Sequence, residues 1–254
     1  MALKWGARRQ VLYYTVGIVL LASLSVVVWQ LFIKKAPTCF DQEQNGSEQG
    51  IDCGGSCALM CPNTAKAPTV LWSRAFLTAP HTYTAAAYIQ NNNVAISGGA
   101  KQIHYSFQLL DSRNILVAER EGVVDIPPVQ TVPIIELNID TGTREVTRTF
   151  FNFSENEAPK WYKVQPETVE KIRVAQTGAY QNGRLTATIA NDSYDDLKKV
   201  QAIAVLFDYD GVARAASKAT LAKVPRRSTA DITFTWPETF TGIARAEVTV
   251  LPNF

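Results

Sequence analysis

An uncharged apolar stretch near the N-terminus constrains this chain more than any other feature of its sequence. The stretch covers residues 11–33 and contains no Asp, Glu, Lys or Arg. A helix of this length reaches roughly 35 Å, at about 1.5 Å per residue, and so crosses the hydrocarbon core of a bilayer with some tilt. We therefore predict a transmembrane helix over residues 11–33, with everything after it on one side of a lipid bilayer.

The flanks of this stretch favour an anchor that stays attached to the protein. A cleaved signal peptide has an apolar region of about 7–15 residues, followed by a cleavage site of small residues. Here the apolar region is longer and ends in WQLFIKK, without an A-x-A pattern. Lys4, Arg8 and Arg9 precede the stretch, whereas only Lys34 and Lys35 follow it. This narrow excess favours a cytoplasmic N-terminus.

The charge of the remaining chain argues against nucleic acid as a partner. All 23 acidic residues follow the apolar stretch, together with 22 of the 25 basic residues, so the balance from residue 34 onward is 22 − 23 = −1. Nucleic-acid binding requires a basic surface that neutralises phosphates. We therefore expect no nucleic-acid partner.

Four cysteines form one compact group shortly after the apolar stretch: Cys39, Cys53, Cys57 and Cys61. An even number of cysteines beside a membrane anchor predicts two disulfides in an oxidising compartment, which places the C-terminal part of the chain outside the cytoplasm. Three pairings are possible and the sequence does not choose among them. Zinc is the alternative, but zinc sites usually show paired C-x2–4-C knuckles, and here the spacings are x13, x3 and x3. Disulfides are therefore favoured.

The loop between the first two cysteines is rich in oxygen-bearing side chains. Calcium prefers several carboxylate and carbonyl oxygens on a loop bent by glycine. The alternative is a solvated acidic loop whose turns use Asn-Gly and Gly-Gly pairs. Both interpretations remain open. The candidate calcium ligands are Asp41, Asn45, Glu48 and Asp52.

Residues 39–61 as a whole read C-F-D-x3-N-G-x-E-x-G-x-D-C-G-G-x-C-x3-C. This pattern resembles a short Cys- and Gly-rich module of bacterial and other surface proteins. The resemblance implies an extracytoplasmic, disulfide-bonded module, and suggests cation binding. Gln42 stands where a glycine often follows the Asp of the motif.

The pattern from residue 70 onward favours short β-strands. Apolar residues recur with period two, and turn signals separate the runs, among them Gly98-Gly99, residues 111–114 and Pro127-Pro128. Many short strands at such spacing are typical of a β-sandwich. The clearest predicted strands are 83–89, 103–109, 115–118 and 132–139.

An internal repeat divides this region into two. The sequence AAYIQN at 86–91 corresponds to TATIAN at 186–191, and FQLLD at 107–111 corresponds to AVLFD at 204–208. A third pair, residues 125–128 and 223–226, keeps the same order, and the offsets are 100, 97 and 98 residues. We predict a tandem duplication with a boundary near Pro166. The shared Asn and Asp positions are expected to form turns.

The repeated FQLLD and AVLFD sequences resemble the FxLYD-type domain, which belongs with the LEA/WHy-related β-sandwiches. Leu110 replaces the aromatic residue of the motif, and Ala204 replaces its leading Phe. The resemblance implies immunoglobulin-like sandwiches of about seven strands, usually found in cell-envelope proteins. It carries no catalytic residues.

The predicted fold class is therefore mainly β, with one N-terminal transmembrane helix, a small disulfide-rich module and two tandem immunoglobulin-like β-sandwiches. The predicted segments are a cytoplasmic tail (1–10), a transmembrane helix (11–33), an acidic Cys/Gly-rich disulfide module (34–61), a linker (62–69), sandwich 1 (70–165) and sandwich 2 (166–254).

Catalytic patterns are missing from the sequence. It contains no G-x-S-x-G, no phosphate-binding glycine loop and no H-E-x-x-H. Of its two histidines, His104 is expected at the surface or edge of a strand. Trp236 and Phe240 are expected to close the core of the second sandwich, and Trp161 with Tyr162 to lie between the two domains.

Carboxylates in the loops of the second repeat could likewise either bind a cation or form turns. Asp192, Asp195 and Asp196 lie near one another, as do Asp208 and Asp210. Each group has the composition of a cation site, but also of a solvated turn, and we favour the turn.

Together these features predict a membrane-anchored, non-catalytic protein that displays two immunoglobulin-like domains outside the cytoplasm. Its expected partners are the lipid bilayer and another envelope or surface protein, and no small-molecule substrate is evident. The alternative is a calcium-dependent adhesion or sensor component that uses the acidic module.

Overall fold

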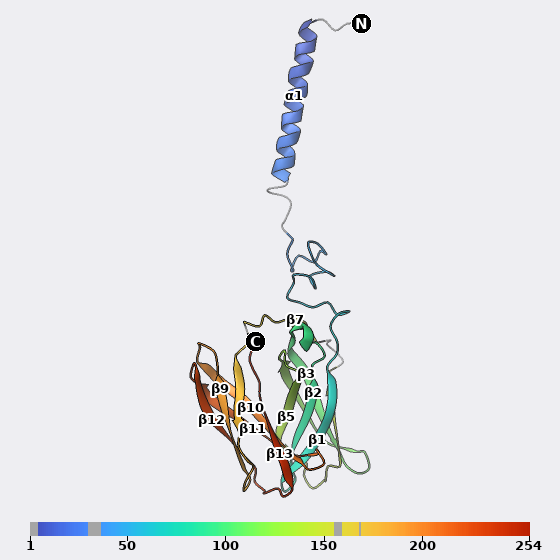
Figure 1. Cartoon of the computed structure of the whole chain (residues 1–254). Helices are drawn as coiled ribbons and strands as arrows, with labels where there is room; N and C mark the ends of the chain where they lie inside the picture. The colour runs from blue at the N-terminus through green and yellow to red at the C-terminus, as the bar shows by residue number, and fades with distance from the viewer. Residues whose placement is uncertain (1–4, 30–36, 155–158, 168) are drawn as a thin grey trace. The chain divides into compact units, whose positions relative to one another are not determined.

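The computed structural model describes residues 5–29, 37–154, 159–167 and 169–254 (Figure 1). The protein is mainly β, with one N-terminal apolar helix, antiparallel sheets and two disulfides, as the sequence predicts. Its chain divides into two compact units, residues 1–52 and residues 53–254.

The N-terminal unit contains one long helix, α1 (Trp5–Val28). Its segment Arg8–Val28 is long and apolar enough to cross a membrane, as an anchor or as a signal sequence. The helix begins six residues before the predicted start because the apolar pattern marks the span alone, whereas Arg and Ala also favour helix. The predicted C-terminal end, 30–33, lies outside the described residues.

The first half of the C-terminal unit forms a β-sandwich, called sandwich 1, from two antiparallel sheets. A short 3-10 helix, η2 (Val94–Ile96), precedes its central strand. One sheet has the order β1 (Thr69–Ala79), β2 (Thr82–Gln90), β5 (Thr131–Asp140). The other has the order β4 (Leu116–Ile126), β3 (Gly98–Leu110), β6 (Arg148–Phe153), with β7 (Trp161–Lys163) also paired to β3.

The second half forms sandwich 2 with the corresponding strand orders. One sheet contains β8 (Ile172–Thr177), β9 (Arg184–Asn191) and β12 (Ser228–Thr235). The other contains β11 (Ala213–Val224), β10 (Leu197–Asp208) and β13 (Ile243–Val250).

Alternating side chains of the central strands fill the two cores. Phe107 and Leu109 of β3 are fully buried in sandwich 1, and Ala204 and Leu206 of β10 are fully buried in sandwich 2. Successive residues of a strand point to opposite faces of its sheet, so these four positions share the inward face. The period-two apolar pattern of the sequence thus corresponds to the inward face of the central strand in both repeats.

The predicted turn at Gly98-Gly99 is wrong, because both residues belong to the start of β3. Glycine is required there by close packing. A Cβ atom on Gly98 would lie 2.5 Å from the Cβ of Asn93, and one on Gly99 would lie 2.7 Å from the ring of Phe254. The glycine pair therefore marks a crowded strand, and turn chemistry does not explain it.

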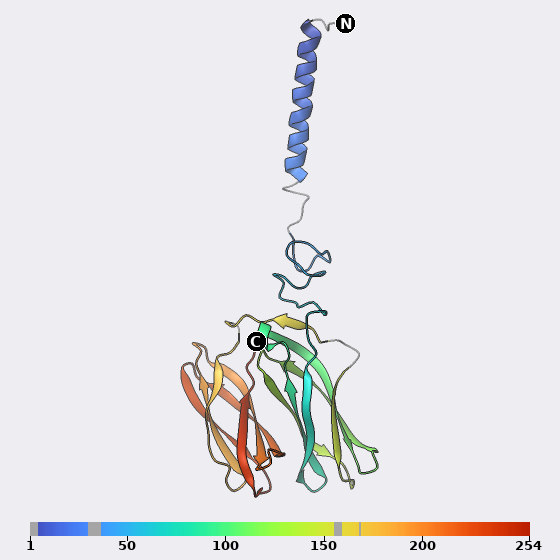
Figure 2. The same ribbon diagram turned by 45° about the vertical axis from the view of Figure 1, so that its right-hand side comes forward.

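A third apolar layer joins the two sandwiches, where the β1–β2–β5 sheet packs against the β11–β10–β13 sheet (Figure 2). The ring of Trp72 stacks on that of Tyr88 with centroids 4.7 Å apart, and Phe207 meets both rings edge-on at 6.4 and 6.3 Å. Both faces of the central strands β2 and β10 are therefore buried. The other buried members of this layer are Phe76, Ala86, Ile135, Ile203, Val205, Ala213 and Ala216.

The two repeats differ at the strand positions that point away from the core of each sandwich. In one sheet of each sandwich these residues are apolar and form the layer, and in the other sheet they are polar. Sandwich 1 contributes its β2 sheet and sandwich 2 its β10 sheet, so the contact is heterologous and would allow further copies to stack. Polar residues at the corresponding outward positions make the two remaining sheet faces unsuited to such stacking. Thr186 and Thr188 stand where β2 has Ala86 and Tyr88, and Ser106 and Gln108 stand where β10 has Ile203 and Val205.

We predict that Phe207→Ala lowers the free energy of unfolding by about 3–5 kcal/mol, because it removes a buried aromatic ring from the layer between the sandwiches. The measurement is urea denaturation of the full chain in detergent, followed by tryptophan fluorescence. Tyr209→Ala is the matched control, since Tyr209 is 83% exposed two residues away, and should change stability by less than about 0.5 kcal/mol. Equal effects of the two substitutions would contradict the layer.

Candidate functional site

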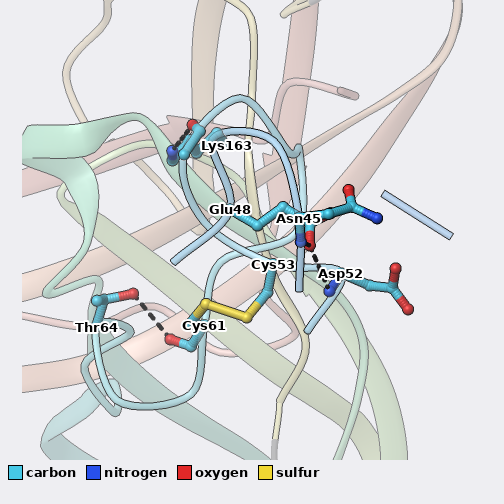
Figure 3. The surroundings of a disulfide bond; sticks show 8 residues. Asn45, Glu48, Asp52, Cys53, Cys61, Thr64 and Lys163 are labelled. Carbon is cyan, nitrogen blue, oxygen red and sulfur yellow. Dashed lines mark hydrogen bonds between the residues drawn. A yellow bond between two sulfur atoms is a disulfide. The ribbon is translucent and has the colours of Figure 1, made fainter. Parts of the chain in front are cut away.

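A disulfide joins Cys53 to Cys61 in the C-terminal unit (Figure 3). Thr64 supports this bridge, since its hydroxyl donates a 2.8 Å hydrogen bond to the carbonyl oxygen of Cys61. Cys39 and Cys57 are also disulfide-bonded, and no described cysteine is free. Zinc binding by cysteine thiolates, the alternative for these four residues, is incompatible with this state.

The segment around this disulfide pairs with β7 of sandwich 1. The backbone N–H of Met60 donates to the carbonyl of Trp161 (2.8 Å), and that of Lys163 donates to the carbonyl of Ala58 (2.7 Å). The Lys163 ammonium also donates to the carbonyl of Gly55 (2.7 Å). Because the Met60 side chain is buried in the core of sandwich 1, this part of the module is continuous with the sandwich.

Trp161 has a different role from the one predicted. Its indole is buried within the core of sandwich 1, among residues of both sheets, so the interpretation as a wedge between the domains is wrong. The layer between the sandwiches is built from other residues, on β1, β2, β5, β10 and β11.

Side-chain amides fasten the predicted linker, 62–69, to sandwich 1. Asn93 exchanges two hydrogen bonds with the backbone of Lys66, at 2.8 and 2.7 Å. The amide of Asn92 donates to the carbonyl of Ala67 at 2.7 Å. These positions of the linker are therefore bound to the domain that follows.

The candidate calcium ligands lie in the N-terminal unit, where their carboxylates accept backbone N–H groups. Asp41 accepts from Thr38 and Glu43 (both 3.1 Å). The side chain of Glu48 accepts from Asn45 (3.2 Å) and from Asp52 (3.3 Å). The pKa of Asp41 is lowered, first by the hydrogen bond from the Asn45 side chain and then by those backbone groups. The acidic side chains thus shape the loop.

Calcium fits this loop poorly as it stands. Both carboxylate oxygens of Asp41 and both of Asp52 already accept hydrogen bonds. One observation points the other way: the amide oxygen of Asn45 is buried with no hydrogen-bond partner among the described residues. An uncompensated buried oxygen is costly, and a cation would compensate it.

Gln42 adopts a backbone conformation that is more typical of glycine. Its φ is 62°, in the left-handed region that glycine adopts without steric cost. The backbone N–H of Gln42 donates to both oxygens of Asp52 at 3.2 and 3.0 Å, which holds this conformation in the absence of glycine.

The repeated Asn residues play the same part in both sandwiches. The buried amide of Asn91 donates to the carbonyl of Pro127 (3.0 Å), and that of Asn191 to the carbonyl of Pro225 (3.1 Å). In both cases the side-chain oxygen accepts the N–H two residues later, at 2.8 and 2.9 Å. These residues therefore tie two distant loops together, in addition to forming the predicted turns.

The repeated Asp residues close the hairpins that follow. Asp111 accepts the N–H groups two and four residues later at 2.9 and 3.0 Å, and Asp208 does so at 3.0 and 2.8 Å. An arginine completes each site, Arg144 beside Asp111 (2.6 Å) and Arg214 beside Asp208 (2.8 Å). The Arg144 guanidinium and then the Ile115 N–H lower the pKa of Asp111 to about 2.

The other predicted residues take structural roles. Trp236 is buried in the core of sandwich 2, with its ring 5.5 Å from that of Tyr180, and Phe240 packs against the same core, as expected. His104 is exposed on β3, also as expected. Asp192 pairs with Arg173 (2.8 Å) and Asp196 with Lys223 (2.6 Å), so these carboxylates serve as ion-pair partners in the loop.

A groove that the sequence analysis did not predict lies at the junction of the sandwiches. It is an open groove of about 680 Å³ between β1, the start of β6 with the two residues before it, and the start of β11. Three arginines line it, Arg74, Arg148 and Arg214. They come from three distant parts of the chain, so no local motif marks them.

No protein-family model matches the chain, and a search of curated proteins gives no match. Among solved structures, the chain is similar to the calcium binding domain CBD12 of CALX1.1, with 11% identity and a TM-score of 0.20, over 66% of this chain and 73% of that chain. It is also similar to CBD12 from CALX1.2, with 11% identity and a TM-score of 0.19, over 66% and 74%. TM-scores this low support no functional argument, and the resemblance to FxLYD-type domains stays a prediction.

Mass mapping under non-reducing conditions should recover two disulfides within residues 39–61, one of them Cys53–Cys61. Replacing this pair by serine should lower stability by about 2–3 kcal/mol, because the bridge closes a short loop of the unfolded chain. Four free thiols in the native protein would contradict both the bridge and the oxidising compartment inferred from it.

Acid stability should depend on Asp111. Its pKa of about 2 lies below the ordinary value of about 3.9, so its contribution to stability is complete above pH 4 and is lost as the pH falls toward 2. Asp111→Asn should lower the melting temperature at pH 5 and flatten its decline between pH 4 and 2. Arg144→Gln, which removes the main cause of the shift, should flatten it as well. Profiles parallel to that of the wild type would contradict this role.

Proposed function

We propose that this protein is a single-pass membrane protein with a cytoplasmic N-terminus, which displays its β-sandwiches outside the cytoplasm to bind an envelope or surface protein. It acts by binding, without catalysis. We keep 70–165 and 166–254 as the proposed bounds of the two immunoglobulin-like domains. The observation that carries the proposal is the apolar layer between the sandwiches, which makes one preorganised body of two domains.

Preorganisation matters for binding because it removes an entropic cost. Two domains that move independently must be ordered when they bind a partner together, and that ordering weakens the complex. Here Trp72, Tyr88 and Phe207 form an aromatic contact between the sandwiches, in which Tyr88 and Phe207 are buried and Trp72 is partly buried. Loops and edges from both domains are thus held in a fixed arrangement suited to one extended partner surface.

The proposed sidedness rests on the disulfides. Buried disulfides persist in oxidising compartments and are rare where thiol reductants are abundant. Cys53 and Cys61 are both buried, and they hold the segment that pairs with β7. The apolar helix α1 then supplies the anchor.

Calcium-dependent adhesion or sensing is the second candidate, favoured by the buried amide oxygen of Asn45, which has no hydrogen-bond partner in the described part of the chain. Isothermal titration of the full chain in detergent decides between the two. Heat of calcium binding that is lost in Asn45→Ala supports the second candidate. The absence of binding heat at millimolar calcium would contradict the second candidate. The acidic side chains would then act only as acceptors of backbone N–H groups.

Intact cells test the main proposal through a photo-crosslinking residue placed at exposed sites of the sandwiches, such as Tyr209 or Tyr194. We expect discrete adducts with an envelope or surface protein, together with digestion of the sandwiches by protease added outside. Cells that carry the same crosslinker but are not irradiated are the control and should give none. Protection of the sandwiches in intact cells, with digestion only after lysis, would contradict the proposed sidedness.

A further inference from the structure

The groove at the sandwich junction is formed mainly by two edge strands. β1 and β6 each end a sheet, so each has a strand neighbour on one side within the described residues. The two strands meet where the Ser73 hydroxyl donates to the carbonyl of Thr149 at 2.8 Å. Phe76 and Ala213 of the groove lining belong to the apolar layer between the sandwiches, and Phe150 is 50% exposed beside them.

The charge of the groove is positive, although the chain after residue 34 is close to neutral. Neither Arg74 nor Arg148 pairs with a carboxylate in the described part of the chain. The guanidinium of Arg148 donates to the neutral amide oxygen of Asn114 at 2.6 Å. Arg214 is the exception, since its charge is offset by Asp208 at 2.8 Å. Two guanidinium groups therefore have no anionic partner among the residues that the structure describes.

We propose that this groove binds an extended, acidic peptide segment of a protein partner. The inference rests on the proposed binding function and names the chemistry of the partner. Arginine guanidinium groups recognise carboxylates through paired, charge-assisted hydrogen bonds, so Arg74 and Arg148 supply the charge selection.

A peptide suits the groove better than other polyanions because of the edge strands. An extended peptide can continue a sheet by pairing its own N–H and C=O groups with those of an exposed edge. Polyphosphates and sulfated sugars have no such regular amide groups. The exposed ring of Phe150 also offers an apolar contact that a side chain of a peptide would cover. The volume of the groove, about 680 Å³, lies within the range of binding pockets, about 300–1,000 Å³.

Fluorescence anisotropy with the full chain in detergent tests the inference. The probe is a labelled ten-residue peptide that alternates Glu with Val or Thr. We expect saturable binding that weakens with salt and falls at least tenfold in the double variant R74Q/R148Q. The control R120Q/R184Q removes two exposed arginines outside the groove and should leave the affinity within twofold. Circular dichroism and melting temperatures verify that all variants are folded. No binding at 1 mM peptide, or equal losses in both double variants, would overturn the inference.

Two further probes separate edge pairing from charge alone. A peptide of the same sequence with every backbone nitrogen methylated keeps the charge but lacks the N–H donors for sheet pairing, and it should bind at least tenfold more weakly. Heparin, a polyanion without a peptide backbone, should not compete at equal charge concentration. Undiminished binding of the N-methylated peptide, or full competition by heparin, would contradict the peptide assignment. In the crosslinking experiment on intact cells, adducts that are unchanged by R74Q/R148Q would contradict the role of this groove but not the proposed function.

Discussion

The apolar layer between the β2 and β10 sheets is the contact on which the rest of the C-terminal unit depends. Burying a large apolar side chain contributes about 1.5–3 kcal/mol, and the layer holds several, among them Phe76, Val205 and Phe207. An ordinary pair of tandem domains has a more polar interface and moves about its linker. Here the strands at the interface are central strands buried on both faces, so separation of the domains would expose the middle of two sheets.

The groove is a consequence of the same packing. Arg74 and Arg148 belong to sandwich 1, and Arg214 to sandwich 2. Only the layer between the sandwiches brings β11 against the edges of β1 and β6. Domain packing therefore shapes the groove: loosening the layer would remove the wall formed by Ala213 and Arg214 and destabilise the fold, while Arg74 and Arg148 would stay together on sandwich 1.

Several elements followed from the sequence because their causes are local. Period-two alternation gave the inward faces of β3 and β10, and the repeated Asn and Asp residues gave the turns. The layer between the sandwiches was missed, although AAAYI in β2 and AIAVLF in β10 are nearly continuous apolar runs, which mark strands buried on both faces. A comparison of the repeats at the positions that point away from each core also indicates this layer. Thr188 in the second repeat stands where the first has the apolar ring of Tyr88.

Predictions that failed, and sites that were missed, depend on distant contacts. Gly98 and Gly99 have turn composition, but the reason for them is the approach of Asn93 and Phe254. Trp161 belongs to a core that its position near a domain boundary does not indicate. For the candidate site, the sequence identified the acidic residues 41–52 but not their use as acceptors of backbone N–H groups, because hydrogen-bond direction is set by the folded loop. The three arginines of the groove share no local pattern.

Hydrogen exchange of the full chain, resolved by mass spectrometry, tests most directly whether the two sandwiches form one cooperative unit. If they do, amides of β2 and β10 share the same high protection and lose it at the same denaturant concentration, because each strand buries a face of the other's sheet. Loss of protection in β10 while β2 remains fully protected would contradict a single unit, and with it the preorganised body on which the proposed function rests.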